Sequence, residues 1–146
     1  MRDLKDALDL GVDGIIAPMV ESAFGVVKFT EAVESIFSKQ KLFKSINIET
    51  KESVEKLDLI MEIAKHKVDN ITIGRTDLGR SYFDTAIYPD SEFIFDLIES
   101  IGCKIQTNGF TLTVGGGVNK ETIRLFRQRK KELEKVVSNI ETRKVI

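Results

Sequence analysis

The sequence has little cysteine, proline or histidine, and it has no tryptophan. Cys103 is the only cysteine, so the chain can form no internal disulfide, and we expect a reducing location, the cytoplasm. We also expect the Cys103 side chain to be buried, as small free cysteines usually are. His66 is the only histidine and stands at the end of a predicted helix, which indicates a surface residue.

The sequence also lacks an excess of charge and a long apolar run. Its 22 basic and 23 acidic residues give a formal net charge of −1, which argues against nucleic acid as a partner. No apolar run approaches the roughly 20 residues of a membrane helix, and the first residues do not resemble a signal peptide. With 146 residues, of which 42% are hydrophobic, we expect one domain over residues 1–146, or part of one.

One short stretch places a carboxylate at the end of a predicted strand. Ile46 and Ile48 recur with the period of two that is typical of a strand. Thr50 is well placed to cap a helix that begins at Lys51. Glu49 therefore lies at the carboxyl end of a strand, where α/β proteins bind ligands.

A second stretch repeats this design about one βα unit later. Residues 69–74 form a predicted strand, and Asp77 lies just beyond its carboxyl end. Adjacent parallel strands would bring Glu49 and Asp77 to the same edge of a sheet. Two carboxylates at such an edge suit Mg²⁺ or Mn²⁺. Ordinary loop polarity and helix capping remain an alternative interpretation of the same residues.

The whole chain alternates predicted helices and strands. We expect Phe24 and Phe93 on the buried faces of their helices, and a longer loop from Gly79 to Tyr88. The predicted helices cover residues 4–10, 22–37, 51–66, 91–108 and 120–137, and the predicted strands cover residues 14–20, 44–50, 69–74, 110–114 and 140–146. Repeated βα units of this kind indicate a parallel α/β sheet with right-handed crossovers.

Five strands fit two architectures. One is a flavodoxin-like open sheet, and the other is part of a TIM-type (β/α)₈ barrel, which typically takes about 250 residues. The chain opens on a helix with no strand before it and stops on Val145 and Ile146, inside an apolar strand. We therefore expect a partial barrel of about five strands, an internal fragment of a longer protein.

Several segments, taken together, resemble the HpcH/HpaI aldolase and citrate lyase β-subunit-like superfamily. Members of that superfamily are (β/α)₈ barrels that make or cleave carbon–carbon bonds with Mg²⁺ or Mn²⁺. The segments that carry the resemblance are Gly11–Ser22, Ile46–Thr50, Ile73–Leu78, Thr113–Val118 and Glu141–Ile146.

The resemblance implies roles for individual residues. Glu49 and Asp77 match the two metal ligands, and the metal would chelate a 2-oxo acid and stabilise its enolate. Asn47 matches a position where the family often has glutamine, which would hydrogen-bond substrate or metal-bound water. The backbone N–H groups of Thr76 and Asp77 match those that hold the substrate carboxylate.

The sequence departs from the family pattern at Arg75, where the family usually has proline. An arginine there would clamp an extra carboxylate or phosphate, or cover the rim of the site. The catalytic arginine and histidine of the aldolase branch lie on early strands that this chain lacks, so the catalytic acid and base are unknown. Gly115 to Gly117 would form an anion-binding nest or a tight strand-to-helix turn.

These observations predict a metal-dependent carbon–carbon lyase or aldolase. Its partner would be a small oxo acid or a related acyl compound, with no nucleic acid or membrane involved, and we expect a homo-oligomer. The alternative is a catalytically silent barrel fragment or binding domain that keeps the fold without turnover.

Overall fold

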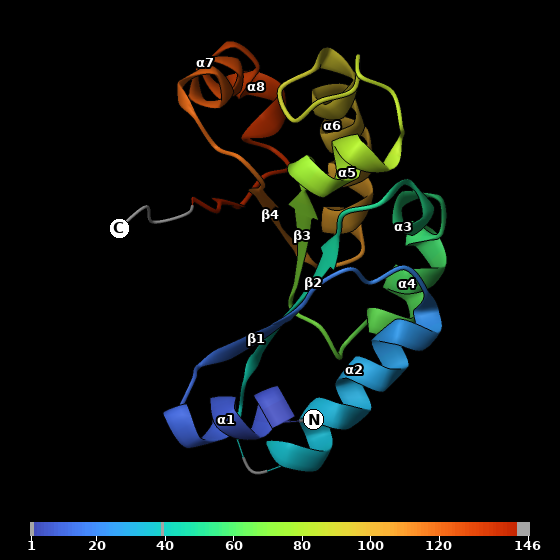
Figure 1. Ribbon diagram of the computed structural model, residues 1–146, viewed down its shortest axis with the longest axis vertical. Helices are drawn as coiled ribbons and strands as arrows, with labels where there is room; N and C mark the ends of the chain where they lie inside the picture. Colours follow the sequence, from blue (N-terminus) through green and yellow to red (C-terminus); the bar gives the residue numbers. More distant parts are fainter. Residues whose placement is uncertain (1, 39, 143–146) are drawn as a thin grey trace.

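The computed structural model describes residues 2–38 and 40–142, in which five strands alternate with helices (Figure 1). The elements are α1 (Arg2–Leu10), β1 (Gly14–Ala17), α2 (Ala23–Ile36), β2 (Phe43–Ile48), α3 (Lys51–Glu55), α4 (Leu57–Ala64), β3 (Asn70–Gly74), α5 (Arg75–Ser81), α6 (Glu92–Thr107), β4 (Thr111–Gly115), α7 (Lys120–Gln128), α8 (Lys130–Leu133) and β5 (Asn139–Ile140).

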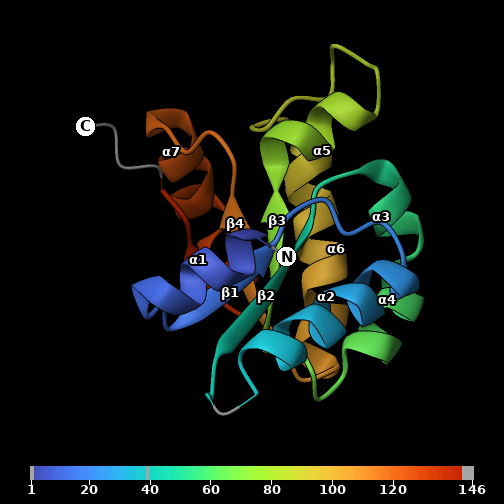
Figure 2. The same cartoon turned by 60° about the horizontal axis from the view of Figure 1, so that its bottom comes forward.

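The five strands form one parallel sheet in the order β1-β2-β3-β4-β5. In a flavodoxin-like sheet the first strand would lie between the second and the third, so that alternative is wrong. Each strand instead lies beside its neighbour in sequence, as in a (β/α) barrel. Figure 2 shows α2, α4 and α6 together along one face of this sheet. The prediction of parallel (β/α) units of the barrel type is confirmed.

The face of the sheet that the helices cover is apolar. Side chains alternate between the two faces along each strand, so every second residue joins this core. The strand residues fully buried here are Ile46, Ile48, Ile71, Ile73, Leu112 and Val114. They pack against α4 and α6, whose buried residues include Ile60 and Ile98. This layer supplies most of the hydrophobic core.

The opposite face of the sheet, the inner face of a barrel, is polar. Asn70, the first residue of β3, donates on this face from Nδ2 to Ser45 Oγ at 2.8 Å and to Thr72 Oγ1 at 3.1 Å. Its Oδ1 accepts from Thr111 Oγ1 at 2.8 Å and from Thr113 Oγ1 at 3.0 Å. TIM barrels usually fill this space with bulky branched side chains. Here hydrogen bonds join three neighbouring strands instead.

Some predicted boundaries were wrong. The predicted helix over residues 51–66 is two helices, α3 and α4, and the predicted loop from Gly79 begins as helix α5. The predicted strand over residues 14–20 ends at Ala17. The last predicted strand forms β5 at Asn139–Ile140, and its residues 143–146 lie outside the described part of the chain. None of the described helices is long and apolar enough to cross a membrane.

Three buried positions were also assigned wrongly. Phe24 is 66% exposed and Phe93 is 44% exposed, and Cys103 is exposed as well. On α6 the buried aromatic residue is Phe95, whose ring meets the ring of Phe126 edge to face at a centroid distance of 5.4 Å. Helix α6 therefore turns its buried stripe away from Phe93.

We expect a polypeptide of residues 1–146 to self-associate, because β1 and β5 each pair on one side only within the described residues. Ile16 on β1 and Phe43, which pairs with Gly14 of the same strand, are each 50% exposed, which adds apolar surface at the β1 side of the sheet. Light scattering measures the association, and Ile16→Lys should reduce it by placing a charge at the edge. A monomeric chain with one sharp unfolding transition would contradict the prediction.

Candidate metal and substrate site

Glu49 occupies a defined position just beyond β2. Its Oε1 accepts hydrogen bonds from the backbone N–H of Met19 at 2.9 Å and from Asn47 Nδ2 at 3.3 Å, and the residue is only 8% exposed. Met19 has a φ of 52°, which residues other than glycine rarely adopt. The predicted cap at Thr50 is confirmed, since Thr50 Oγ1 accepts from Ser53 N at 3.2 Å. The backbone after β1 and the side chain of Asn47 therefore hold the carboxylate, and the capped turn after β2 positions its residue.

Gly74 leaves room for this carboxylate. The pairing of Ile48 with Ile73 places Glu49 beside Gly74, the last residue of β3. A Cβ atom on Gly74 would lie 2.3 Å from Glu49 Oε2, closer than two such atoms can approach. Only glycine at this position lets the carboxylate extend over the end of β3.

Asn47 lies on the same face of β2 as Glu49. Its Nδ2 donates to Glu49, but its Oδ1 is buried without a hydrogen-bond partner among the described residues. A buried acceptor without a donor is costly, since water is excluded and nothing replaces it. The structure thus brings Asn47 and Glu49 together and leaves one acceptor available for a ligand donor.

Asp77 lies in the first turn of α5, directly after β3. Its side chain is 53% exposed, and Arg80 Nη1 lies 3.7 Å from its Oδ1. Glu49 and Asp77 therefore follow two adjacent strands at the same edge of the sheet. Among residues 2–38 and 40–142 no group of three histidine, cysteine or acidic side chains could hold one metal ion. A Mg²⁺ site often uses only one or two carboxylates.

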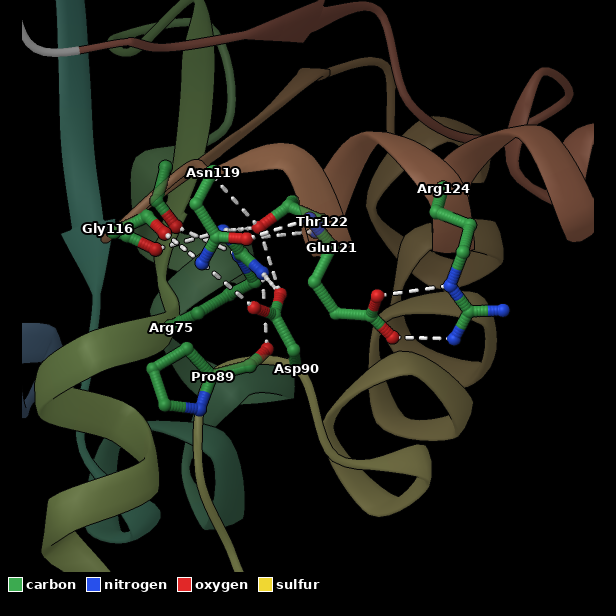
Figure 3. A network of polar contacts seen from close by, with 10 residues as sticks. Arg75, Pro89, Asp90, Gly116, Asn119, Glu121, Thr122 and Arg124 are labelled. Atoms are coloured by element: carbon green, nitrogen blue, oxygen red, sulfur yellow. Dashed lines mark hydrogen bonds and ion pairs between the residues drawn. The ribbon is translucent and has the colours of Figure 1, made fainter.

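Arg75 has neither of the two roles expected from the sequence, which were to clamp a carboxylate or phosphate or to cover the rim of the site. Its side chain is fully buried, and all five guanidinium N–H groups have acceptors (Figure 3). The acceptors are Gly115 O at 3.1 Å, Pro89 O at 3.0 Å, Asp90 Oδ1 at 2.6 Å, Gly116 O at 2.7 Å and Thr122 Oγ1 at 3.5 Å. Burial lowers the pKa of Arg75, while Asp90 opposes this shift. No N–H group is left for a substrate, so Arg75 is neither a clamp nor a rim residue.

Asp90 extends the Arg75 contacts into a network. Its Oδ1 accepts from Thr122 Oγ1 at 2.8 Å, and its Oδ2 accepts from Asn119 Nδ2 at 3.1 Å (Figure 3). Asn119 caps α7 by accepting from the backbone N–H of Glu121 at 2.7 Å and of Thr122 at 3.2 Å. One buried ion pair therefore joins the starts of α5 and α7.

The glycine loop after β4 packs tightly against the start of α5. Gly116 and Gly117 have φ values of 85° and 62°, which favour glycine. A Cβ atom on Gly116 would lie 2.7 Å from the backbone nitrogens of both Arg75 and Thr76. The loop is thus a tight turn, and its lack of side chains keeps the amide of Thr76 uncovered.

Other features lie away from this edge. His66 is exposed in the turn before β3, at the amino ends of the strands. A surface hollow of about 690 Å³ is lined by the exposed face of α7, including Ile123 and Arg127, together with Thr142. Neither Glu49 nor Asp77 contributes to it. Alternation along the strand places Thr142 on the helix-covered face, so the hollow lies on the outer side of the sheet.

The fold and the site define a (β/α) barrel-type protein with a carboxylate site at the carboxyl ends of its strands. The sequence model of the family HpcH/HpaI aldolase/citrate lyase matches residues 1–110, so the chain belongs to that family. The segments Thr113–Val118 and Glu141–Ile146 lie beyond this match. No curated protein matches the sequence.

Solved structures show the same fold. The HpcH/HpaI aldolase from Desulfitobacterium hafniense DCB-2 is 16% identical with a TM-score of 0.71, covering 95% of this chain and 60% of that one. RipC from Yersinia pestis is 14% identical with a TM-score of 0.71, covering 95% and 62%. A variant of the citrate synthase SbnG is 19% identical with a TM-score of 0.68, covering 97% and 60%. The chain thus spans about three fifths of these proteins.

We expect Asp90→Ala to reduce the free energy of unfolding by about 3–5 kcal/mol, because it leaves the buried Arg75 charge unpaired. Urea denaturation of the complete protein measures the change. Asp58→Ala is the control, since Asp58 pairs with Lys104 at 3.1 Å on the surface, and it should cost less than about 1 kcal/mol. Equal losses in both variants would contradict the assigned importance of the buried pair.

Proposed function

We propose that the chain forms part of a divalent-metal-dependent carbon–carbon lyase or aldolase acting on a small oxo acid or a related acyl compound. The observation that carries this proposal is the placement of Glu49, which two hydrogen bonds hold at the end of β2 with its Oε2 over Gly74. Membership in an aldolase and citrate lyase family supports the reaction class.

The residues present suit Mg²⁺ or Mn²⁺. Glu49 and Asp77 supply carboxylate oxygens from adjacent strand ends, the type of ligand that these hard cations prefer. The buried Oδ1 of Asn47, which has no donor among the described residues, suits a metal-bound water or a substrate hydroxyl. When bound, the ion would act as a Lewis acid that stabilises negative charge on the substrate oxygens.

The other residues of the edge bind and orient the substrate. Backbone N–H groups of Thr76 and Asp77, in the first turn of α5, would hold the substrate carboxylate. Gly116 contributes by leaving the amide of Thr76 uncovered. Arg75 touches no substrate in this proposal, because its five hydrogen bonds hold the surrounding backbone.

The activity belongs to the complete protein, of which we propose that residues 1–146 form a single partial barrel domain. This chain spans about three fifths of its structural relatives, so further strands would complete the barrel and its specificity. We also propose a cytoplasmic location and a homo-oligomeric state for the complete protein.

Titration of the complete protein with Mn²⁺, followed by electron spin resonance, tests the metal site. We expect Glu49→Gln and Asp77→Asn each to weaken binding by about tenfold or more, because each removes a charged ligand but keeps the shape of the side chain. Asp58→Asn is the matched control, since Asp58 lies on the surface of α4, and it should bind Mn²⁺ like the wild type.

The pattern of losses separates the alternatives. If neither variant changes Mn²⁺ affinity, the metal site is wrong, and a catalytically silent barrel becomes the better interpretation. If only Asp77→Asn loses affinity, Glu49 is a structural residue that binds Met19 and Asn47 rather than the ion.

A further inference from the structure

Glu141 stands at the end of β5 as Glu49 stands at the end of β2. The pairing of Val114 with Ile140 and the hydrogen bond from Glu141 N to Val114 O at 2.9 Å place it beside Gly115. A Cβ atom on Gly115 would lie 3.2 Å from Glu141 Oε2. Each of the two glutamates therefore extends its carboxylate over a glycine at the end of the neighbouring strand.

The two glycines are themselves partners, because Gly74 pairs with Gly115. Glu49, Gly74, Gly115 and Glu141 thus form one row across β2, β3, β4 and β5. Three strand spacings separate the two glutamate backbones by roughly 14 Å. Both carboxylates lie over the glycines, so no side chain stands between them; we call this row of four residues the trough.

The row below the trough is polar throughout. The strand register aligns Asn47, Thr72, Thr113 and Asn139, one from each of the four strands. The buried Oδ1 of Asn47, which has no partner among the described residues, belongs to this row. A ligand in the trough therefore meets hydrogen-bonding groups rather than a packed apolar core. This points to a polar ligand independently of the two carboxylates.

We propose that Glu141 is a catalytic residue of this site and transfers the proton of the reaction. The inference rests on the proposed function, in which Glu49 and Asp77 hold the ion on the β2–β3 side. Glu141 approaches the same trough from β5, on the far side of the Gly74–Gly115 pair. It faces the substrate rather than joining the two metal ligands.

In the proposed step, the proton that Glu141 removes from the substrate is later returned to a fragment of the same substrate. In cleavage, a carboxylate oxygen of Glu141 takes the proton of the substrate hydroxyl, and a carbonyl forms at that carbon. The electron pair of the broken carbon–carbon bond passes to the oxo-acid fragment as its enolate. Glu141 then returns the proton to the enolate carbon. No oxidant or further reactant is needed, and the carboxylate is regenerated.

The test uses the complete protein with Mn²⁺ and pyruvate in D₂O, since pyruvate is a small oxo acid with exchangeable protons beside its carbonyl. Proton NMR follows the loss of the methyl signal, and spin resonance measures Mn²⁺ affinity separately. We expect Glu141→Gln to slow exchange by about 100-fold or more while changing Mn²⁺ affinity less than about twofold. Glu141→Asp should recover part of the rate, and the control Glu62→Gln, exposed on α4, should leave it unchanged.

A matched pair of glycine substitutions tests the geometry. In Gly115→Ala the new Cβ would lie 3.2 Å from Glu141 Oε2, so that carboxylate must shift by a few tenths of an ångström, and exchange should slow modestly while Mn²⁺ still binds. In Gly74→Ala the new Cβ would fall 2.3 Å from Glu49 Oε2, so Mn²⁺ affinity should fall. Unchanged exchange in Gly115→Ala would contradict the assigned position of Glu141.

The outcomes distinguish this inference from the proposed function. Full exchange by Glu141→Gln overturns the inference and leaves the lyase proposal standing. Loss of Mn²⁺ binding in Glu141→Gln also overturns it, because Glu141 is then a metal ligand. A wild type that binds Mn²⁺ but exchanges no protons overturns the proton-transfer role alone. A wild type that binds no Mn²⁺ overturns the proposed function and this inference with it.

Discussion

The arrangement of the segments at the carboxyl ends of the strands depends on the burial of one guanidinium group. A buried arginine remains charged, and it is tolerated only where a counter-ion and enough acceptors surround it. Arg75 meets this condition with the carboxylate of Asp90 and with backbone carbonyls from Pro89, Gly115 and Gly116. Its guanidinium also lies 5.9 Å from the ring centre of Phe95. These acceptors come from separate segments, so the burial of Arg75 holds those segments together.

The burial of Arg75 also positions the proposed site, because residues of that site are covalent neighbours or hydrogen-bond partners of Arg75. Thr76 and Asp77 follow Arg75 directly, while Gly115 is both an acceptor for Arg75 and part of the trough floor. The same interaction therefore positions a proposed metal ligand, the proposed carboxylate-binding amides and the glycine beside Glu141. A change at Asp90 would disturb all of them at once, although Asp90 itself touches none of the proposed ligands.

The two faces of the sheet differ in composition: the face under the helices is apolar, and the inner face, which carries the proposed site, is polar. The face under α4 and α6 is filled with fully buried isoleucine, leucine and valine. The inner face instead carries the hydrogen-bonded group around Asn70, with Ser45 and Thr72 beneath the carboxylates. These small side chains satisfy one another, so the hydrogen bonds offset the cost of burying them. The inner face can therefore be polar without leaving the sheet poorly packed.

The sequence by itself determined the features that depend on neighbouring residues. The period of two at Ile46 and Ile48, the cap at Thr50, and the position of Glu49 at a strand end all follow from local spacing. Helix faces were harder, since Phe24 lies in an apolar run where several orientations would bury hydrophobic side chains equally well.

Only the tertiary structure decided the contacts between distant segments. Arg75 and Asp90 are 15 residues apart, and Arg75 and Thr122 are 47 residues apart, so no local pattern links them. Likewise, Glu141 and Gly115 become neighbours only through the register of β4 with β5. Local spacing fixes which residues lie at the end of a strand, but strand pairing fixes which ends lie side by side, because hydrogen bonds between strands form only in the assembled sheet.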